Sequence, residues 1–122
     1  MTMTLAAKSH DQPDDVRRFD HGSVAVVNVA GVSVGRVVFE PGWRWSEHVR
    51  PLAGTASCEV AHTGYVLSGR LAIRMDDGRE AVAGPGDIFV VSPGHDGWVV
   101  GAEPCVLLDW AGGAEYARRE PQ

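Results

Sequence analysis

The sequence is poor in cysteine: its 122 residues include only Cys58 and Cys105, which do not form a Cys-x-x-Cys pair. This excludes the disulfide-dense scaffold of many small secreted domains and the paired-cysteine pattern of a structural zinc site. The N-terminus also lacks a basic start followed by an apolar stretch, the pattern of a secretory signal. We therefore expect a cytoplasmic protein with free thiols.

Long apolar runs and an excess of basic residues are absent as well. No run approaches the roughly 20 apolar residues that span a bilayer. Acidic residues outnumber basic ones, 16 to 11, for a net charge of −5. Neither a membrane nor a nucleic acid is expected as a partner. A nucleophile elbow and a phosphate-binding glycine loop that opens a helix are also missing, which argues against serine-hydrolase and nucleotide chemistry.

No segment of ten or more residues shows a convincing helical period, whereas short Val-rich runs punctuated by glycine and proline fill the middle of the chain. Asp77-Gly78 is typical of a tight hairpin turn whose residues have positive φ, and Gly84–Asp87 reads GPGD, another turn. Many short strands predict an all-β protein, a sandwich or small barrel. We expect a polar N-terminal tail or arm over residues 1–20, a barrel over 21–112 and a C-terminal tail over 113–122.

The stretch from Ser57 to Leu71, SCEVAHTGYVLSGRL, reads as a strand with apolar residues on both faces. Such a strand is covered on both sides, by a second sheet or by another subunit, and the second reading predicts a homodimer.

Two motifs in the sequence resemble those of the cupin family, over roughly residues 35–110. Five residues separate Gly42 from His48, and six separate His62 from Gly69, as in the first cupin motif. Residues 84–95, GPGDIFVVSPGH, look like the opening of the second motif. The resemblance implies a single-domain jelly-roll β-barrel, with metal ligands carried by these motifs.

The ligand pattern departs from the three-His-one-Glu set of the family. His62 stands where the family has glutamate, and the second histidine maps to Arg50 or to Cys58, depending on the direction of counting. The last histidine position falls on Gly97, with His95 two residues earlier. Any metal site is therefore rearranged.

A rearranged site has four candidate ligands: His48, Cys58, His62 and His95. Cys58 and His62 share a face of the expected strand but lie about 13 Å apart along it, so either a bend or bulge brings them together or the two are not both ligands. Thiolate and imidazole favour a divalent transition metal such as iron, zinc, copper or nickel. The plain alternative for each is a packing or surface role, with Cys58 as a buried small hydrophobe.

Aromatic residues flank the candidate ligands and suggest an apolar pocket for an organic molecule; core filling is the alternative. The predicted pocket residues are Trp43, Trp45, Arg50, Tyr65 and Trp98.

Together these features predict a metal-binding cupin that acts as a small metal-dependent enzyme on a small organic molecule, an oxygenase, isomerase or lyase by resemblance. The alternative is a non-catalytic module that senses or binds a metal or ligand. A third reading is a metal-free barrel with Cys58 as a reactive thiol.

Overall fold

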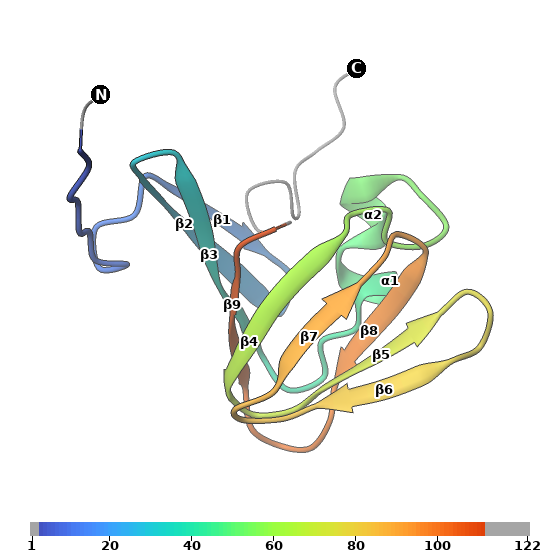
Figure 1. Ribbon diagram of the computed structural model, residues 1–122. Helices are drawn as coiled ribbons and strands as arrows, with labels where there is room; N and C mark the ends of the chain where they lie inside the picture. The colour runs from blue at the N-terminus through green and yellow to red at the C-terminus, as the bar shows by residue number, and fades with distance from the viewer. Residues whose placement is uncertain (1–2, 112–122) are drawn as a thin grey trace.

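The structure, a computed structural model, describes residues 3–111, and its regular secondary structure is almost entirely β-strand (Figure 1). The only helices in this range are the single turns α1 (Trp45–His48) and α2 (Arg50–Ala53). No helix among these residues is long and apolar enough to cross a membrane. The strands are β1 (Asp15–Phe19), β2 (Gly22–Val29), β3 (Val32–Phe39), β4 (His62–Ser68), β5 (Leu71–Met75), β6 (Glu80–Ala83), β7 (Ile88–Val91), β8 (His95–Val99) and β9 (Cys105–Asp109).

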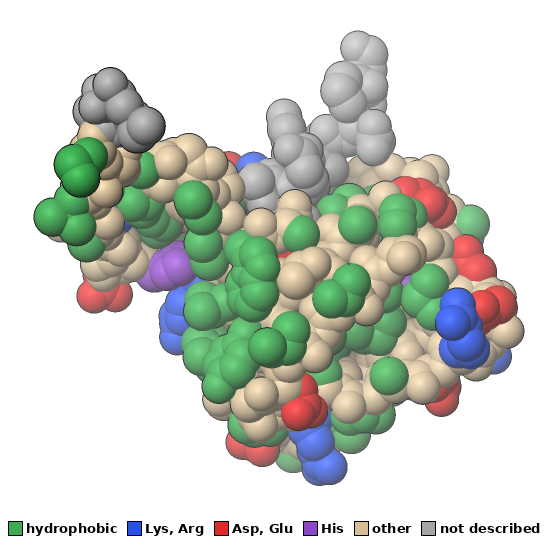
Figure 2. All heavy atoms as spheres, in the orientation of Figure 1, with side chains coloured by type: hydrophobic (Ala, Val, Ile, Leu, Met, Phe, Trp, Pro, Cys, Tyr) green, Lys and Arg blue, Asp and Glu red, His purple; other side chains and the backbone are tan. Residues whose placement is uncertain are grey.

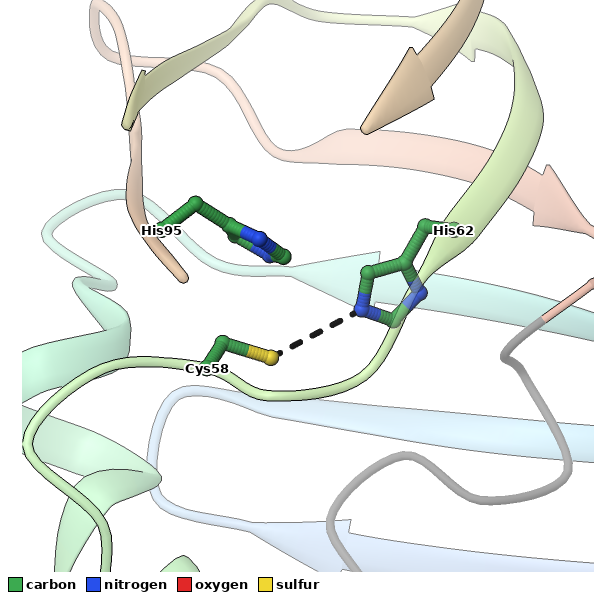
Figure 3. Close-up of side chains that lie close together, drawn as sticks. All are labelled: Cys58, His62 and His95. Atoms are coloured by element: carbon green, nitrogen blue, oxygen red, sulfur yellow. Dashed lines mark hydrogen bonds between the residues drawn. The ribbon is translucent and has the colours of Figure 1, made fainter. Parts of the chain in front are cut away.

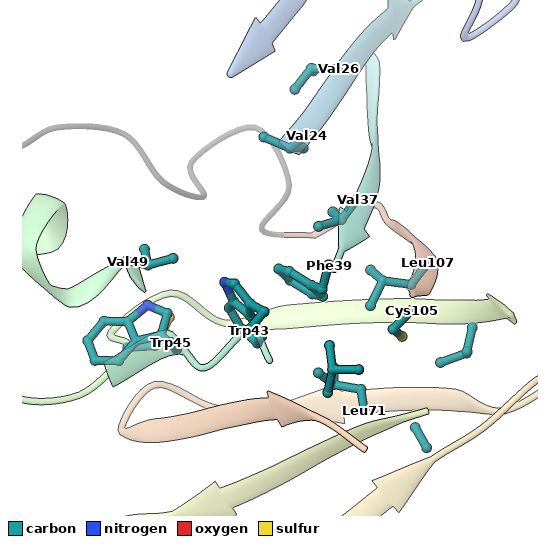
Figure 4. Packing of buried hydrophobic residues seen from close by; sticks show 14 residues of the cluster. Val24, Val26, Val37, Phe39, Trp43, Trp45, Val49, Leu71, Cys105 and Leu107 are labelled. Atoms are coloured by element: carbon teal, nitrogen blue, oxygen red, sulfur yellow. The ribbon is translucent and has the colours of Figure 1, made fainter. Parts of the chain in front are cut away.

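The strands form two antiparallel sheets. One has six strands in the order β1-β2-β3-β9-β4-β7, and the other has three in the order β6-β5-β8. Non-consecutive strands lie side by side, with β9 between β3 and β4. The sheets enclose one apolar core, to which strands of both contribute (Figure 4). This confirms the predicted all-β fold of jelly-roll type.

The two predicted turns are present. The β5–β6 connection turns at Gly78, whose φ is 93° and whose N–H donates to the carbonyl of Met75 at 2.9 Å. Positive φ is found at Gly78 alone and not at Asp77, so the turn is not the two-residue type with positive φ at both positions. Gly86 has a φ of 88° in the second turn.

The predicted N-terminal and C-terminal tails compare differently with the structure. Asp15–Phe19, part of the expected N-terminal tail, forms β1 and pairs with β2 along its whole length. The expected C-terminal tail over 113–122 lies outside the described residues.

The expected strand over residues 57–71 begins only at His62. Its inward residues His62, Gly64 and Val66 are buried, whereas Leu67 is 43% exposed. Ile88 and Val90 of the neighbouring β7 are also exposed. Hydrophobic side chains gather on the surface in the region of β4 and β9 (Figure 2). A homodimer through such a face remains a prediction.

Candidate metal centre

His62, the first residue of β4, points into the barrel and is held there by β9. Antiparallel pairing of β4 with β9 places Gly64 opposite Asp109. From the end of β9 the Asp109 carboxylate reaches the Nδ1 atom of His62 at 2.5 Å. Asp109 is only 2% exposed, and its other carboxylate oxygen accepts the N–H of Ala111 at 3.1 Å.

Backbone hydrogen bonds link the segments that carry Cys58 and His95. The N–H of Cys58 donates to the carbonyl of His95 at 2.7 Å, and the N–H of Gly94 donates to the carbonyl of Cys58 at 2.7 Å. This isolated bridge lies just before β4 and at the first residue of β8. The two side chains therefore enter the interior side by side.

The three side chains converge on one point (Figure 3). Cys58 Sγ lies 3.7 Å from His62 Nε2, and one ligand atom from each of Cys58, His62 and His95 lies within 4.8 Å of the others. The chain between Cys58 and His62 is not extended strand, and its irregular path supplies the bend that a shared site requires. All three residues are buried.

The hydrogen bonds of the two imidazoles fix which nitrogen is available to a metal. His62 Nδ1 faces a carboxylate and His95 Nδ1 faces the carbonyl of Ser92 at 2.8 Å, so both Nδ1 atoms must donate. In the neutral ring, Nε2 then carries the lone pair. Such outer partners are typical of metal-binding histidines.

Without a metal, the contact between Cys58 and His62 favours the thiolate form of Cys58 and the imidazolium form of His62. Burial raises the pKa of Cys58, but hydrogen bonds from His62 and His95 outweigh it and lower the pKa to about 6. Burial likewise lowers the pKa of His62, but hydrogen bonds to Asp109 and Cys58 outweigh it and raise the pKa to about 9. Cys105 is buried without such partners, and burial raises its pKa to about 11.

The donor set fits a divalent transition metal. Zn–S and Zn–N bonds of about 2.3 and 2.0–2.1 Å in a tetrahedral site imply an S···N separation of about 3.6 Å, close to the 3.7 Å between Cys58 and His62. One thiolate and two imidazoles suit zinc, iron, copper or nickel better than magnesium or calcium. Three protein donors also leave a position for water or an organic ligand.

A cavity of about 40 Å³ adjoins the imidazoles. Its ionisable side chains among the described residues are His62, His95 and Asp109. The rest of its wall is Gly97 and the aliphatic and aromatic residues Val37, Phe39, Trp43, Trp45, Leu71, Ile73, Phe89, Val91 and Leu107. The indole N–H of Trp43 is buried without a hydrogen-bond partner. The indole of Trp43 stacks on Phe39 with ring centroids 3.8 Å apart.

Of the predicted pocket residues, Trp43 and Trp45 line this cavity, whereas Arg50, Tyr65 and Trp98 do not. Tyr65 alternates with the inward residues of β4, and Trp98 alternates with those of β8, so both lie on the opposite faces. Arg44 covers the Trp98 ring, its guanidinium carbon 4.6 Å from the centroid. Arg50 lies in α2, beside a separate hollow.

His48, the fourth predicted ligand, is not brought to the cluster. It ends the helical turn α1, where its Nδ1 accepts the N–H of Arg44 at 2.9 Å. Its ring lies 4.1 Å from that of His21, and its Nε2 is 3.9 Å from a carboxylate oxygen of Asp20. His48 instead belongs to a second group, with Asp20 and His21, in which one ligand atom from each residue lies within 4.8 Å of the others.

Asp109 is the site residue that sequence reasoning missed. The strand alternation could have identified it: Asp109 lies two residues after Leu107 and four after Cys105, so its side chain points to the same buried face as theirs. A carboxylate on the buried face of an apolar strand requires a partner, and His62 supplies it.

A cupin domain model matches residues 35–111. The chain belongs to the cupin family. No curated protein sequence matches it. Solved structures with a similar fold include ectoine synthase from P. lautus (13% identity, TM-score 0.62, covering 91% of this chain and 83% of that one). An RmlC-like cupin from Shewanella frigidimarina (13%, TM-score 0.59, 94% and 98%) and KdgF from Halomonas sp. (19%, TM-score 0.58, 88% and 91%) are others.

In this cupin the family's last histidine position falls on Gly97, and a histidine stands two residues earlier, at His95. The surroundings of Gly97 restrict the space for a side chain there. A Cβ on Gly97 would lie 3.3 Å from the carbonyl oxygen of Ala72 and 3.8 Å from Cζ3 of Trp43. The Trp43 ring thus borders the space that a side chain at position 97 would enter.

Proposed function

We propose that this cupin is a small metal-dependent enzyme whose divalent transition metal is held by Cys58, His62 and His95. One observation carries the proposal: these buried donors, two from residues 58–62 and one from the start of β8, converge beside a cavity. Membership of the cupin family supports it, because the family model matches residues 35–111, and this range contains all three donors.

Each residue has a distinct part in this function. A bound metal would supply Lewis-acid polarisation of a substrate oxygen or nitrogen. Asp109 holds the His62 ring in the orientation that directs Nε2 to the cluster, and the carbonyl of Ser92 does the same for His95. Trp43 and Trp45 form an aromatic wall that orients a small organic molecule and keeps bulk water out.

Metal analysis of the purified protein tests the proposal. We expect close to one transition metal ion per chain, and its loss in the variants Cys58→Ala, His62→Ala and His95→Ala. His48→Ala is the matched control and retains the metal, because His48 lies outside the cluster. Metal content that is unaffected by the three cluster variants would overturn the assignment.

A non-catalytic metal- or ligand-binding module is the second candidate. The small volume of the cavity favours it, because 40 Å³ leaves little room for two reacting molecules. The two candidates differ in one measurement: the enzyme converts a molecule that binds at the metal, whereas the module returns it unchanged.

A further inference from the structure

The indole Nε1 of Trp43 is the one buried side-chain nitrogen or oxygen within residues 3–111 that has no hydrogen-bond partner. Trp43 is only 3% exposed, so bulk water does not solvate this N–H. Buried tryptophans usually donate to a partner, and a buried N–H that lacks one is unfavourable. This N–H is therefore suited to an acceptor that comes from outside the chain.

The neighbours of Trp43 hold its ring in place. One face stacks on Phe39, with ring planes 21° apart (Figure 4). Ring atoms Cζ3 and Cη2 lie 3.8 and 3.9 Å from the position that a Cβ on Gly97 would take. The Trp43 backbone donates to the carbonyl of Glu40 at 3.0 Å and accepts the N–H of Val99 at 3.1 Å. The indole is thus fixed on both sides and along its backbone, so its N–H does not turn out to solvent.

Trp43 also lines the cavity that adjoins His62 and His95. This cavity is the space beside the ring in which an atom from outside the chain can stand. An indole N–H only donates, so the atom that meets it has to be an acceptor, such as a carbonyl, carboxylate, hydroxyl or ether oxygen. A group that can only donate, such as an ammonium, does not satisfy it.

The size of the cavity keeps the metal cluster and Trp43 within reach of one small molecule. Since one water molecule requires roughly 10–15 Å³, a cavity of about 40 Å³ holds about three waters. A ligand of about four non-hydrogen atoms fills it before the wall has to move. Such a ligand has room for one atom that binds the metal and one acceptor at its other end.

We propose that Trp43 determines the specificity of this site, its N–H donating to an oxygen of the organic ligand. The inference rests on the proposed function, because the other end of the ligand binds the metal held by Cys58, His62 and His95. The ligand class is a small molecule with one metal-binding atom and a second, accepting oxygen. An analogue that lacks this oxygen leaves the N–H buried without a partner and binds more weakly.

Mercaptoethanol and propanethiol are a matched pair of probes for zinc-loaded protein. Both have a sulfur that binds zinc as the thiolate, and they differ only in a terminal hydroxyl against a methyl group. Calorimetry gives both affinities in the unsubstituted protein and in Trp43→Phe, which keeps an aromatic ring and removes the N–H. We expect the affinity ratio of mercaptoethanol to propanethiol to fall about tenfold in Trp43→Phe.

Comparison of ratios cancels any effect of the substitution that both thiols share, such as a change in zinc affinity. Trp45→Phe is the matched control. Trp45 lines the same cavity but has no such orphaned N–H, so the ratio should stay unchanged.

The indole N–H is also observed directly in a proton–nitrogen NMR spectrum of the zinc-loaded protein. Mercaptoethanol should move the Trp43 resonance downfield, as hydrogen bonding does, and propanethiol should not. Assignment by elimination, with phenylalanine variants of Trp45, Trp98 and Trp110, makes this readout independent of whether Trp43→Phe folds.

The outcomes separate the two proposals. Zinc that the chain does not retain, or that Cys58→Ala retains equally, overturns the metal site and this inference with it. With zinc bound as expected, an unchanged affinity ratio in Trp43→Phe or an unmoved Trp43 resonance overturns the inference alone.

Discussion

His62 donates its Nδ1–H to the carboxylate of Asp109 over 2.5 Å, and this contact joins the first residue of β4 to the last residue of β9. It fixes both the orientation of the imidazole and its tautomer. The Nε2 atom consequently faces Cys58, 3.7 Å away. The geometry of the proposed metal site thus depends on a residue that does not itself belong to the ligand set.

Asp109→Asn should weaken metal binding by about 10–100-fold, the usual effect of losing an outer partner of a metal-binding histidine. The asparagine oxygen can still accept the Nδ1–H but no longer offers a negative charge. Competition with a chromogenic chelator measures the affinity. Asp77→Asn, at an exposed hairpin carboxylate, is the control and should leave the affinity unchanged; equal affinities for wild type and Asp109→Asn would contradict the positioning role.

Metal binding should release one proton at slightly alkaline pH, and that proton should come from His62. The pKa of Cys58, lowered to about 6, leaves a thiolate that needs no deprotonation, whereas the pKa of His62, raised to about 9, leaves an imidazolium that must lose its proton. Affinity should therefore rise by about tenfold per pH unit as pH increases from about 7 to about 8.5, and level off above about 9. Release of two protons at about pH 8, measured with an indicator in weak buffer, would show that Cys58 starts as a thiol.

The thiolate of Cys58 should also be visible directly in the metal-free protein. Its absorbance near 240 nm should appear with a midpoint near pH 6, because the neighbouring imidazoles outweigh the effect of burial. Cys58→Ser should remove this transition, and Cys105→Ser should leave it in place because burial keeps the pKa of Cys105 at about 11. His62→Gln should shift the midpoint upward; a midpoint near 9 in the unsubstituted protein would show that the imidazoles do not stabilise the thiolate.

The fold was predictable because its signals are local. Gly78 and Gly86 mark turns that a short window of sequence reveals, and both adopt positive φ in the structure. Alternation along a strand is equally local. Applied to Tyr65 and Trp98, it would have placed both on faces opposite to His62 and His95.

The site was predictable only in part, because its assembly depends on long-range pairing. The sequence identified Cys58, His62 and His95 as candidates but could not show the bridge between Cys58 and His95 that brings them together. It likewise could not show that β9 would lie beside β4 and deliver Asp109. His48 lies outside the cluster because it belongs to the helical turn α1. This turn is too short to show a helical hydrophobic period in the sequence.

Gly64→Ala should destabilise the protein and narrow the cavity, since Gly64 lies where β4, β7 and β9 meet. A Cβ at this position would stand 2.4 Å from the carbonyl oxygen of Leu108 and 2.6 Å from the Phe89 ring. Backbone cannot yield easily there, so the ring must move, and Phe89 lines the cavity. We expect a loss of about 1–3 kcal/mol in the free energy of unfolding, typical of overpacking, together with weaker binding of any ligand at the metal. Denaturant unfolding measures the first effect, with Gly84→Ala as the matched control, because its Cβ would meet only ordinary contacts, the nearest being Arg70 Cγ at 3.5 Å. If both variants unfold at the same denaturant concentration as the unsubstituted protein, β4 does not pack against Phe89 and Leu108 as closely as the structure shows.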